Sequence, residues 1–199
     1  MRERILERLA AHRPVRVRAS PRAAARGATA RGATALTPAG VLVPLIEREA
    51  GLTLLLTQRT IHLPEHSGEV CFPGGRHEPG DRDLIETALR ESEEEIGLDR
   101  RLVEVAGCLD VYHTGTGFAV VPVVGFIRAP FALAPDPVEV EAVFEVPLDF
   151  LLDPINRRRE RRRYPEGEFE YHVYDFGGRR IWGATAGMIV NFLELIGTD

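Results

Sequence analysis

The chain has 199 residues and a formal net charge of -5, and its 44% apolar and 28% charged residues are typical of one globular domain with a sizeable core. Its 25 basic residues are all arginines. The absence of lysine excludes a Walker A phosphate loop, a protein-kinase β3 lysine and a Schiff-base lysine, which all need an ammonium group. The negative net charge argues against general nucleic-acid binding, because polyanions bind to a net positive face.

Cysteine usage and the apolar runs indicate the compartment. Cys71 and Cys108 lie in apolar, strand-like stretches, so a disulfide framework is not expected. No apolar run has the length of a membrane span. Nine arginines between Arg2 and Arg31 suggest a transit peptide, but Ser20 is the one serine there, which is too few. A cytoplasmic protein is therefore predicted.

The first 39 residues differ in composition from the rest. Residues 2–12 carry apolar positions at helical spacing, and a stretch rich in Pro, Ala and Gly continues to Gly40. We predict an N-terminal helix and a loosely ordered arm over residues 1–39, and a folded domain over residues 40–199. Within this domain, the apolar runs 41–46 and 52–57 predict a β-hairpin.

The segment Asp83 to Ile96 is the strongest predicted helix. Asp83 followed by Glu86 is a capping-box arrangement, and Gly97 provides a C-terminal stop. Strands are predicted at 102–110, 119–127, 141–146 and 170–174, and a closing helix at 183–196. Because helices and strands mix without regular alternation, we expect a single α/β or α+β domain with three layers.

Three carboxylates crowd one side of the Asp83 to Ile96 helix. Glu91, Glu94 and Glu95 fall within about 100° of arc, on the side away from the apolar stripe. Such like charges repel each other, and a hard divalent cation such as Mg²⁺ or Mn²⁺ is their natural partner. A solvated acidic face is the alternative that the charges alone leave open.

The context of these carboxylates carries a family resemblance. The chain has Phe72-Pro73-Gly74-Gly75, then Asp81, then Arg90-Glu91 and Glu94-Glu95, and then Gly97-Leu98. This pattern resembles the Nudix box of hydrolases that cleave nucleoside diphosphates linked to another moiety. Asp81 replaces the first glutamate, eight rather than seven residues separate it from Arg90, and Ser92 takes an apolar position. The resemblance implies an α/β/α sandwich with a mixed central sheet.

A second motif points to one branch of that family. Residues 55–60, His66, Gly68 and residues 72–75 resemble the sequence before the box in coenzyme A diphosphatases, and the likeness resumes at 144–148, 151–154 and 181–187. That branch has Ser or Ala at Thr60, Arg at Pro64 and Gln at Glu69. Pro64 is the important departure, because proline cannot replace an anion-binding arginine. The resemblance implies hydrolysis of coenzyme A to adenosine 3′,5′-bisphosphate and 4′-phosphopantetheine.

The resemblance also implies roles for individual residues. Those implied to bind Mg²⁺ or Mn²⁺ are Gly75, Glu91, Glu94 and Glu95. Glu94 would also assist catalysis, and Arg90 would orient the glutamates. Water would be the nucleophile, with Glu139 and Glu91 as equally weighted candidates for the general base. Arg59 and His66 are expected to bind substrate.

The segment Arg157 to Arg163 contains six arginines and one glutamate. We expect a loop whose Arg157 and Arg158 attract the 3′-phosphate of coenzyme A, with a solvated basic loop as the alternative. Two rival functions remain. One is a Nudix diphosphatase for nucleotide sugars or dinucleoside polyphosphates, and the other is a silent module that binds nucleotide or RNA through this loop. The intact carboxylates argue against the silent module. The expected partner is a small-molecule substrate, with no membrane or nucleic acid, and a homodimer remains open.

Overall fold

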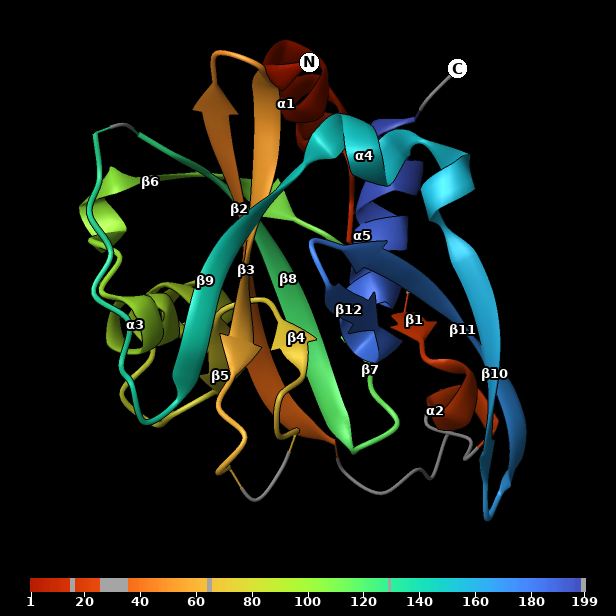
Figure 1. Cartoon of the computed structure of the whole chain (residues 1–199). Helices are drawn as coiled ribbons and strands as arrows, with labels where there is room; N and C mark the ends of the chain where they lie inside the picture. Colours follow the sequence, from red (N-terminus) through yellow and green to blue (C-terminus); the bar gives the residue numbers. More distant parts are fainter. Residues whose placement is uncertain (15–16, 26–35, 64–65, 129, 198–199) are drawn as a thin grey trace.

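A computed structural model describes residues 1–14, 17–25, 36–63, 66–128 and 130–197. Its central layer, within these residues, is a nine-stranded mixed sheet. At its centre, β2 (Thr37–Arg48) pairs antiparallel with β3 (Gly51–Arg59) and parallel with β8 (Phe118–Ile127). Helices cover both sides of this sheet (Figure 1). The predicted mixed sheet between two helical layers is confirmed.

The other strands extend the sheet from β3 and β8. The two that pair antiparallel with β3 are β4 (Val70–Cys71) and β9 (Val140–Pro147). The two that pair antiparallel with β8 are β6 (Val103–Cys108) and β7 (Val111–His113). The remaining two are β1 (Val17–Ala19), parallel to β7, and β5 (Gly74–Arg76), antiparallel to the start of β2.

A second, antiparallel sheet stands beside the first (Figure 1). Its described strands are β10 (Arg158–Tyr164), β11 (Gly167–Phe176) and β12 (Arg179–Trp182). The α-helices are α1 (Arg2–Ala11), α2 (Pro21–Ala25), α3 (Leu84–Ile96), α4 (Leu148–Leu152) and α5 (Gly183–Ile196), and short 3₁₀ turns cover Arg100–Leu102 and Pro154–Asn156. No described helix has the length and apolar character needed to cross a membrane.

The alternation of side chains along β2 explains the layers. Leu42 and Ile46 point to the face covered by α3, where they pack in one buried cluster. Val43 and Leu45 point to the opposite face and pack in the cluster that includes α5. Because both faces are covered, β2 reads as a nearly continuous apolar run.

The N-terminal helix contributes to the same core. The side chains of Ile5 and Leu9 on α1 are buried in the cluster that also contains residues of α5. After α1, residues 17–25 form β1 and α2, and β2 begins at Thr37, three positions before the predicted domain start at Gly40. The predicted hairpin is confirmed, with a tighter turn that pairs Arg48 with Gly51.

The caps of α3 are confirmed in part. The Asp83 carboxylate accepts hydrogen bonds from the backbone N of Ile85 at 3.0 Å and of Glu86 at 2.8 Å. The Glu86 carboxylate accepts from the backbone N of Arg82 at 2.9 Å, so the return bond expected of a capping box is made one residue earlier. Gly97 ends the helix with a φ of 66°.

The loop predicted at Arg157 to Arg163 is wrong, because residues 158–164 form strand β10. Its arginines pair across the hairpin with acids of β11, as Arg159 Nη1 does with Glu170 Oε2 at 3.0 Å. Opposite charges across two strands stabilise a hairpin without apolar alternation. A pattern search based on apolar residues therefore misses this strand.

Candidate active site

Two glycines let the acidic helix α3 approach the sheet closely. A Cβ atom on Gly40 of β2 would lie 2.2 Å from the carbonyl oxygen of Leu84, at the start of α3. A Cβ on Gly75 of β5 would lie 2.5 Å from the carboxyl carbon of Glu91. Both distances are shorter than a Cβ tolerates, so the bare backbone at these positions fixes how close the Glu91 carboxylate comes to β5.

Glu95 is the most deeply buried acid of this helix, with 5% of its surface exposed. Its Oε2 accepts a hydrogen bond from the backbone N of Gly74 at 3.1 Å, and Arg59 Nη1 lies 3.7 Å from its Oε1. Burial is the main reason why the pKa of Glu95 is raised to about 8, and the negative charges of Glu91 and Glu139 raise it further. The hydrogen bond from Gly74 and the charge of Arg59 act in the opposite direction, because they favour the ionised form.

Glu91 and Glu139 bring two more carboxylates to the same place. Burial raises the pKa of Glu91, and the charges of Glu94 and Glu139 add to this effect, while Arg90 opposes it. Glu139 directly precedes β9, and its backbone oxygen accepts a hydrogen bond from the backbone N of Thr60 at 3.0 Å. The fold thus places an acid from outside the helix against the acidic face of α3.

Arg90 connects these carboxylates. Its guanidinium donates from Nε to Asp81 Oδ1 at 2.8 Å and from Nη2 to Asp81 Oδ2 at 3.1 Å. It also contacts Glu94 Oε2 at 2.8 Å and Glu91 Oε1 at 3.0 Å. The Asp81 side chain is 4% exposed, and its bonds to Arg90 hold the pKa of its carboxyl well below the usual range. The longer spacing between Asp81 and Arg90 therefore still permits a two-pronged ion pair.

The donor chemistry fits a hard divalent cation. Among the described residues, no group of three or more His, Cys, Asp or Glu side chains already forms a metal-binding cluster. The carboxylates of Glu91, Glu95 and Glu139 are nevertheless close enough for their charges to repel one another. Burial also disfavours the ionised forms of Glu91 and Glu95. A divalent cation would relieve this repulsion, and Mg²⁺ and Mn²⁺ favour carboxylate and carbonyl oxygen ligands.

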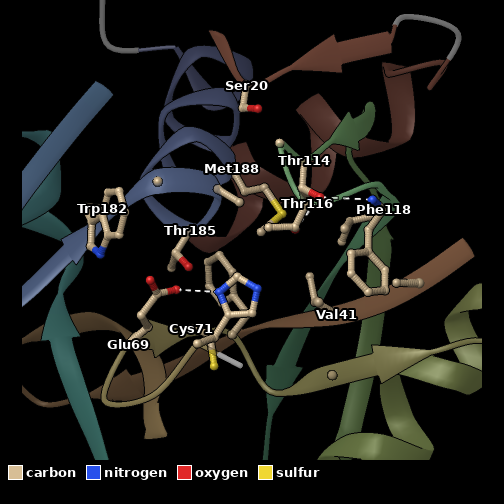
Figure 2. Close-up of a pocket in the computed structure, with 18 of the residues that line it drawn as sticks. Ser20, Val41, Glu69, Cys71, Thr114, Thr116, Phe118, Trp182, Thr185 and Met188 are labelled. Atoms are coloured by element: carbon tan, nitrogen blue, oxygen red, sulfur yellow. Dashed lines mark hydrogen bonds and ion pairs between the residues drawn. The ribbon is translucent and has the colours of Figure 1, made fainter. Parts of the chain in front are cut away.

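A pocket of about 380 Å³ lies beside this acidic face. Its lining includes Arg59, Gly74 and Gly75, which also contact or adjoin the buried carboxylates. In Figure 2, Trp182 and Phe118 stand on opposite sides of the pocket, and Met188 lies between them. The exposed surface of the pocket as a whole is more apolar than polar, as expected of a site for an organic ligand.

His66 is held in an unusual conformation at this pocket. Its φ of 56° is the one positive value among the described residues other than glycine. Its Nδ1 lies 2.7 Å from Glu69 Oε2, and both residues line the pocket. Figure 2 shows Glu69 at this side of the pocket. Strain of this kind is common at ligand-binding loops.

The structure brings most residues singled out in the sequence to this place. Those gathered around α3 and β5 are Arg59, Gly75, Arg90, Glu91, Glu94, Glu95 and Glu139. Arg157 and Arg158 do not line the pocket. Arg158 instead pairs with Glu160 and Asp175 on the second sheet. Pro64 lies outside the described residues.

Several pocket residues escaped the sequence-based prediction. Trp182 lines the pocket, with the Arg162 guanidinium 3.7 Å from its ring centroid. Arg22 and Ser20 come from the segment predicted to be a loosely ordered arm, and Thr116 comes from the turn before β8. No spacing motif connects these residues. They come together only in the tertiary fold, so the sequence alone does not show that they share a pocket.

Comparison with known proteins agrees with the motif. The NUDIX domain family profile matches residues 36–166. The chain is 43% identical over 159 residues to Nudix hydrolase 15, mitochondrial, of Arabidopsis thaliana, covering 76% of this chain and 56% of that protein. It is 40% identical over 160 residues to the uncharacterized Nudix hydrolase NudL of Yersinia pestis, covering 79% of each chain.

The likeness covers only part of some of these relatives. The chain spans little more than half the length of Nudix hydrolase 15 and of a second Arabidopsis relative, Nudix hydrolase 22, chloroplastic. A crystal structure of a C. elegans Ap4A hydrolase binary complex matches with a TM-score of 0.49 at 20% identity, over 56% of this chain and 80% of that one. From the profile match and the NudL relatives, the chain belongs to the Nudix hydrolase family.

Proposed function

We propose that this protein is a divalent-metal-dependent diphosphatase that hydrolyses coenzyme A or its derivatives to adenosine 3′,5′-bisphosphate and 4′-phosphopantetheine. The observation that carries the reaction class is the pair of desolvated carboxylates, Glu91 and Glu95, held against the glycine backbone of residues 74–75 at a pocket. The coenzyme A substrate is supported by the resemblance of residues 55–75 to that branch. The relatives and structural neighbours leave this substrate unassigned.

The carboxylates and Gly75 are the groups proposed to hold the metal. A bound Mg²⁺ or Mn²⁺ would neutralise charge on the diphosphate oxygens and lower the pKa of a water molecule towards 7. Arg90 fixes the direction of Glu91 and Glu94 through its bonds to both. Arg59, close to Glu95 and lining the pocket, is placed to contact the diphosphate.

The proton of the attacking water needs an acceptor near the same carboxylates. Glu91 and Glu139 both remain candidates, since each lies within electrostatic reach of Glu95. In the hydrolysis, the water oxygen bonds to one phosphorus while the bond from that phosphorus to the bridging oxygen breaks. The proton passes to the carboxylate, and the two phosphate monoesters leave as products.

The basic segment does not favour the rival module that binds RNA. Arg158, Arg159 and Arg161 on β10 all pair with carboxylates of the second sheet. An RNA-binding surface needs cations free to displace counterions from phosphates. This pairing supports the enzyme over the binding module.

The test is product analysis by phosphorus NMR. Coenzyme A, its dephosphorylated form and ADP-ribose are each incubated with Mg²⁺ or Mn²⁺ and with wild type, Glu95→Gln or Glu93→Gln. Glu93 is the matched control, because it lies on the same helix but is exposed and paired with Arg100. We expect adenosine 3′,5′-bisphosphate from wild type and Glu93→Gln, and a rate lower by at least about 100-fold in Glu95→Gln.

Other product patterns would contradict parts of this proposal. Cleavage of ADP-ribose without cleavage of coenzyme A would remove the substrate assignment and make Pro64 the main clue. Equal rates in Glu95→Gln and wild type would remove the metal site.

A further inference from the structure

A second compartment adjoins the pocket on the side of Phe118. It has a volume of about 530 Å³, and its described lining consists of Arg22, Thr37, His66, Arg76, Gly115, Thr116 and Phe118. All of these except Thr37 also line the first pocket, so the two spaces are neighbours. Figure 2 shows Thr116 and Phe118 across the pocket from Trp182 and Glu69.

The charge of this compartment is one-sided. Two guanidinium groups line it, and no carboxylate is among its described lining residues. Arg76 stands at the end of β5, directly after Gly75, with its guanidinium 5.3 Å from the centroid of the Phe118 ring. No described carboxylate pairs with Arg76. Its charge is therefore available to a ligand.

Arg22 reaches the compartment from α2, outside the matched domain of residues 36–166. Its Nη2 donates to Glu166 Oε1 at 3.0 Å, and its guanidinium lies 4.7 Å from the centroid of the Tyr164 ring. These contacts anchor the side chain between the N-terminal segment and the second sheet. Its Nε is buried and has no hydrogen-bond partner among the described residues, while the side chain lines the compartment.

We propose that this compartment is an anion subsite in which Arg22 and Arg76 bind a phosphate monoester on the nucleotide half of the substrate. A guanidinium presents several donors in a fork that matches phosphate oxygens, and Thr116 offers a further hydroxyl. In the proposed function Arg59 and Gly75 meet the diphosphate, and Arg76, the residue after Gly75 in β5, lines both the first pocket and the compartment. The ligand class is thus a nucleotide with a second phosphate on its ribose.

This inference rests on the proposed function for the position of the diphosphate, but its test needs no hydrolysis. Calorimetry would measure the binding of adenosine 3′,5′-bisphosphate and of adenosine 5′-monophosphate at fixed ionic strength. The proteins are wild type, Arg22→Gln, Arg76→Gln and Arg101→Gln. Arg101 is the matched control, since its side chain is 86% exposed, pairs with Asp99 and lines neither pocket.

We expect wild type and Arg101→Gln to bind the bisphosphate about tenfold or more tightly than the monophosphate. In Arg76→Gln that preference should fall at least about threefold, with little change for the monophosphate. Arg22→Gln should lower the preference in the same way. If Arg22→Gln does not fold because the ion pair with Glu166 is lost, Arg76→Gln alone still tests the proposal. A wild type without preference, or an Arg76→Gln preference equal to that of wild type, would overturn the proposal.

The hydrolysis experiment separates this inference from the proposed function. If wild type prefers the bisphosphate but leaves coenzyme A intact, the subsite stands and the enzymatic assignment falls. If it cleaves coenzyme A and its dephosphorylated form equally well and binds both nucleotides equally, the diphosphatase stands and the subsite falls.

Discussion

At the scale of single residues, the acidic site depends on the contacts that the Arg90 guanidinium makes with three carboxylates. Asp81 takes two of its bonds, while Glu91 and Glu94 take one each. Asp81 also accepts a hydrogen bond from Thr87 Oγ1 at 2.8 Å. Asp81 is therefore a positioning residue, which holds Arg90 at the angle that directs both glutamates.

We expect Asp81→Asn to lower the free energy of unfolding by about 1–3 kcal/mol at neutral pH, because an amide cannot match a carboxylate opposite a guanidinium. The pKa of Asp81 is depressed in the folded state, so its contribution is complete above the unfolded value near 4 and declines below it. Urea unfolding at several pH values should show the gap between wild type and variant narrowing as the pH falls below about 4.

Glu93→Gln serves as the comparison for this change. Its exposed pair with Arg100 should contribute less than about 1 kcal/mol at any pH. A constant gap between wild type and Asp81→Asn down to pH values of about 2, or no gap at neutral pH, would show that Asp81 does not anchor Arg90 in this way.

At the scale of elements, the site depends on the close packing of α3 on β2 and β5. The first turn of α3 meets the backbone of Gly40 so closely that a Cβ there would lie 2.2 Å from the oxygen of Leu84. Any added atom must push the helix away from the sheet. The carboxylates of Glu91 and Glu95 move with the helix, so this contact determines their distance from Gly74 and Gly75.

Gly40→Ala should therefore reduce both stability and activity. We expect a loss of about 1–3 kcal/mol in the free energy of unfolding from overpacking, and at least about a tenfold loss of metal-dependent turnover. Gly80→Ala is the matched control, since nothing lies within 4 Å of a Cβ at Gly80. It should keep the stability and turnover of wild type. Equal behaviour of the two variants would mean that the sheet tolerates a shift of α3.

The elements also differ in how well the sequence predicts them. The hairpin of β2 and β3, the helix α3 with its caps and the closing helix α5 are predictable because apolar spacing and cap residues are local signals. Strand β10 is not, because cross-strand ion pairs rather than apolar residues stabilise it. The carboxylates of the motif share one helix and are found from spacing. Arg22 and Thr116 meet only through the tertiary fold, so no spacing predicts them.

At the scale of the whole molecule, the N-terminal helix α1 contacts the C-terminal helix α5 and the central sheet. Arg4 Nε in α1 donates to the backbone oxygen of Ile196 at 2.8 Å, at the end of α5. Figure 1 shows α1 and α5 at the two ends of the colour scale. Arg2 reaches the sheet, with Nη1 3.1 Å from Glu47 Oε2 and Nη2 2.9 Å from Glu104 Oε1. These contacts tie α1 to elements that are distant in the sequence.

The fully buried Ile5 tests whether α1 unfolds with the rest of the molecule. We expect Ile5→Ala to lower the free energy of unfolding by about 2–4 kcal/mol, because it leaves a cavity in the core shared with α5. Glu7→Ala, on the exposed face of the same helix, should change it by less than about 0.5 kcal/mol. Both would be measured by urea unfolding followed by tryptophan fluorescence, since Trp182 lies at the start of α5.

If the transition midpoint of Ile5→Ala equalled that of wild type, α1 would be an independent arm, as its composition predicts. A lower midpoint with an unchanged slope would make residues 2–11 part of one cooperative unit with the catalytic domain.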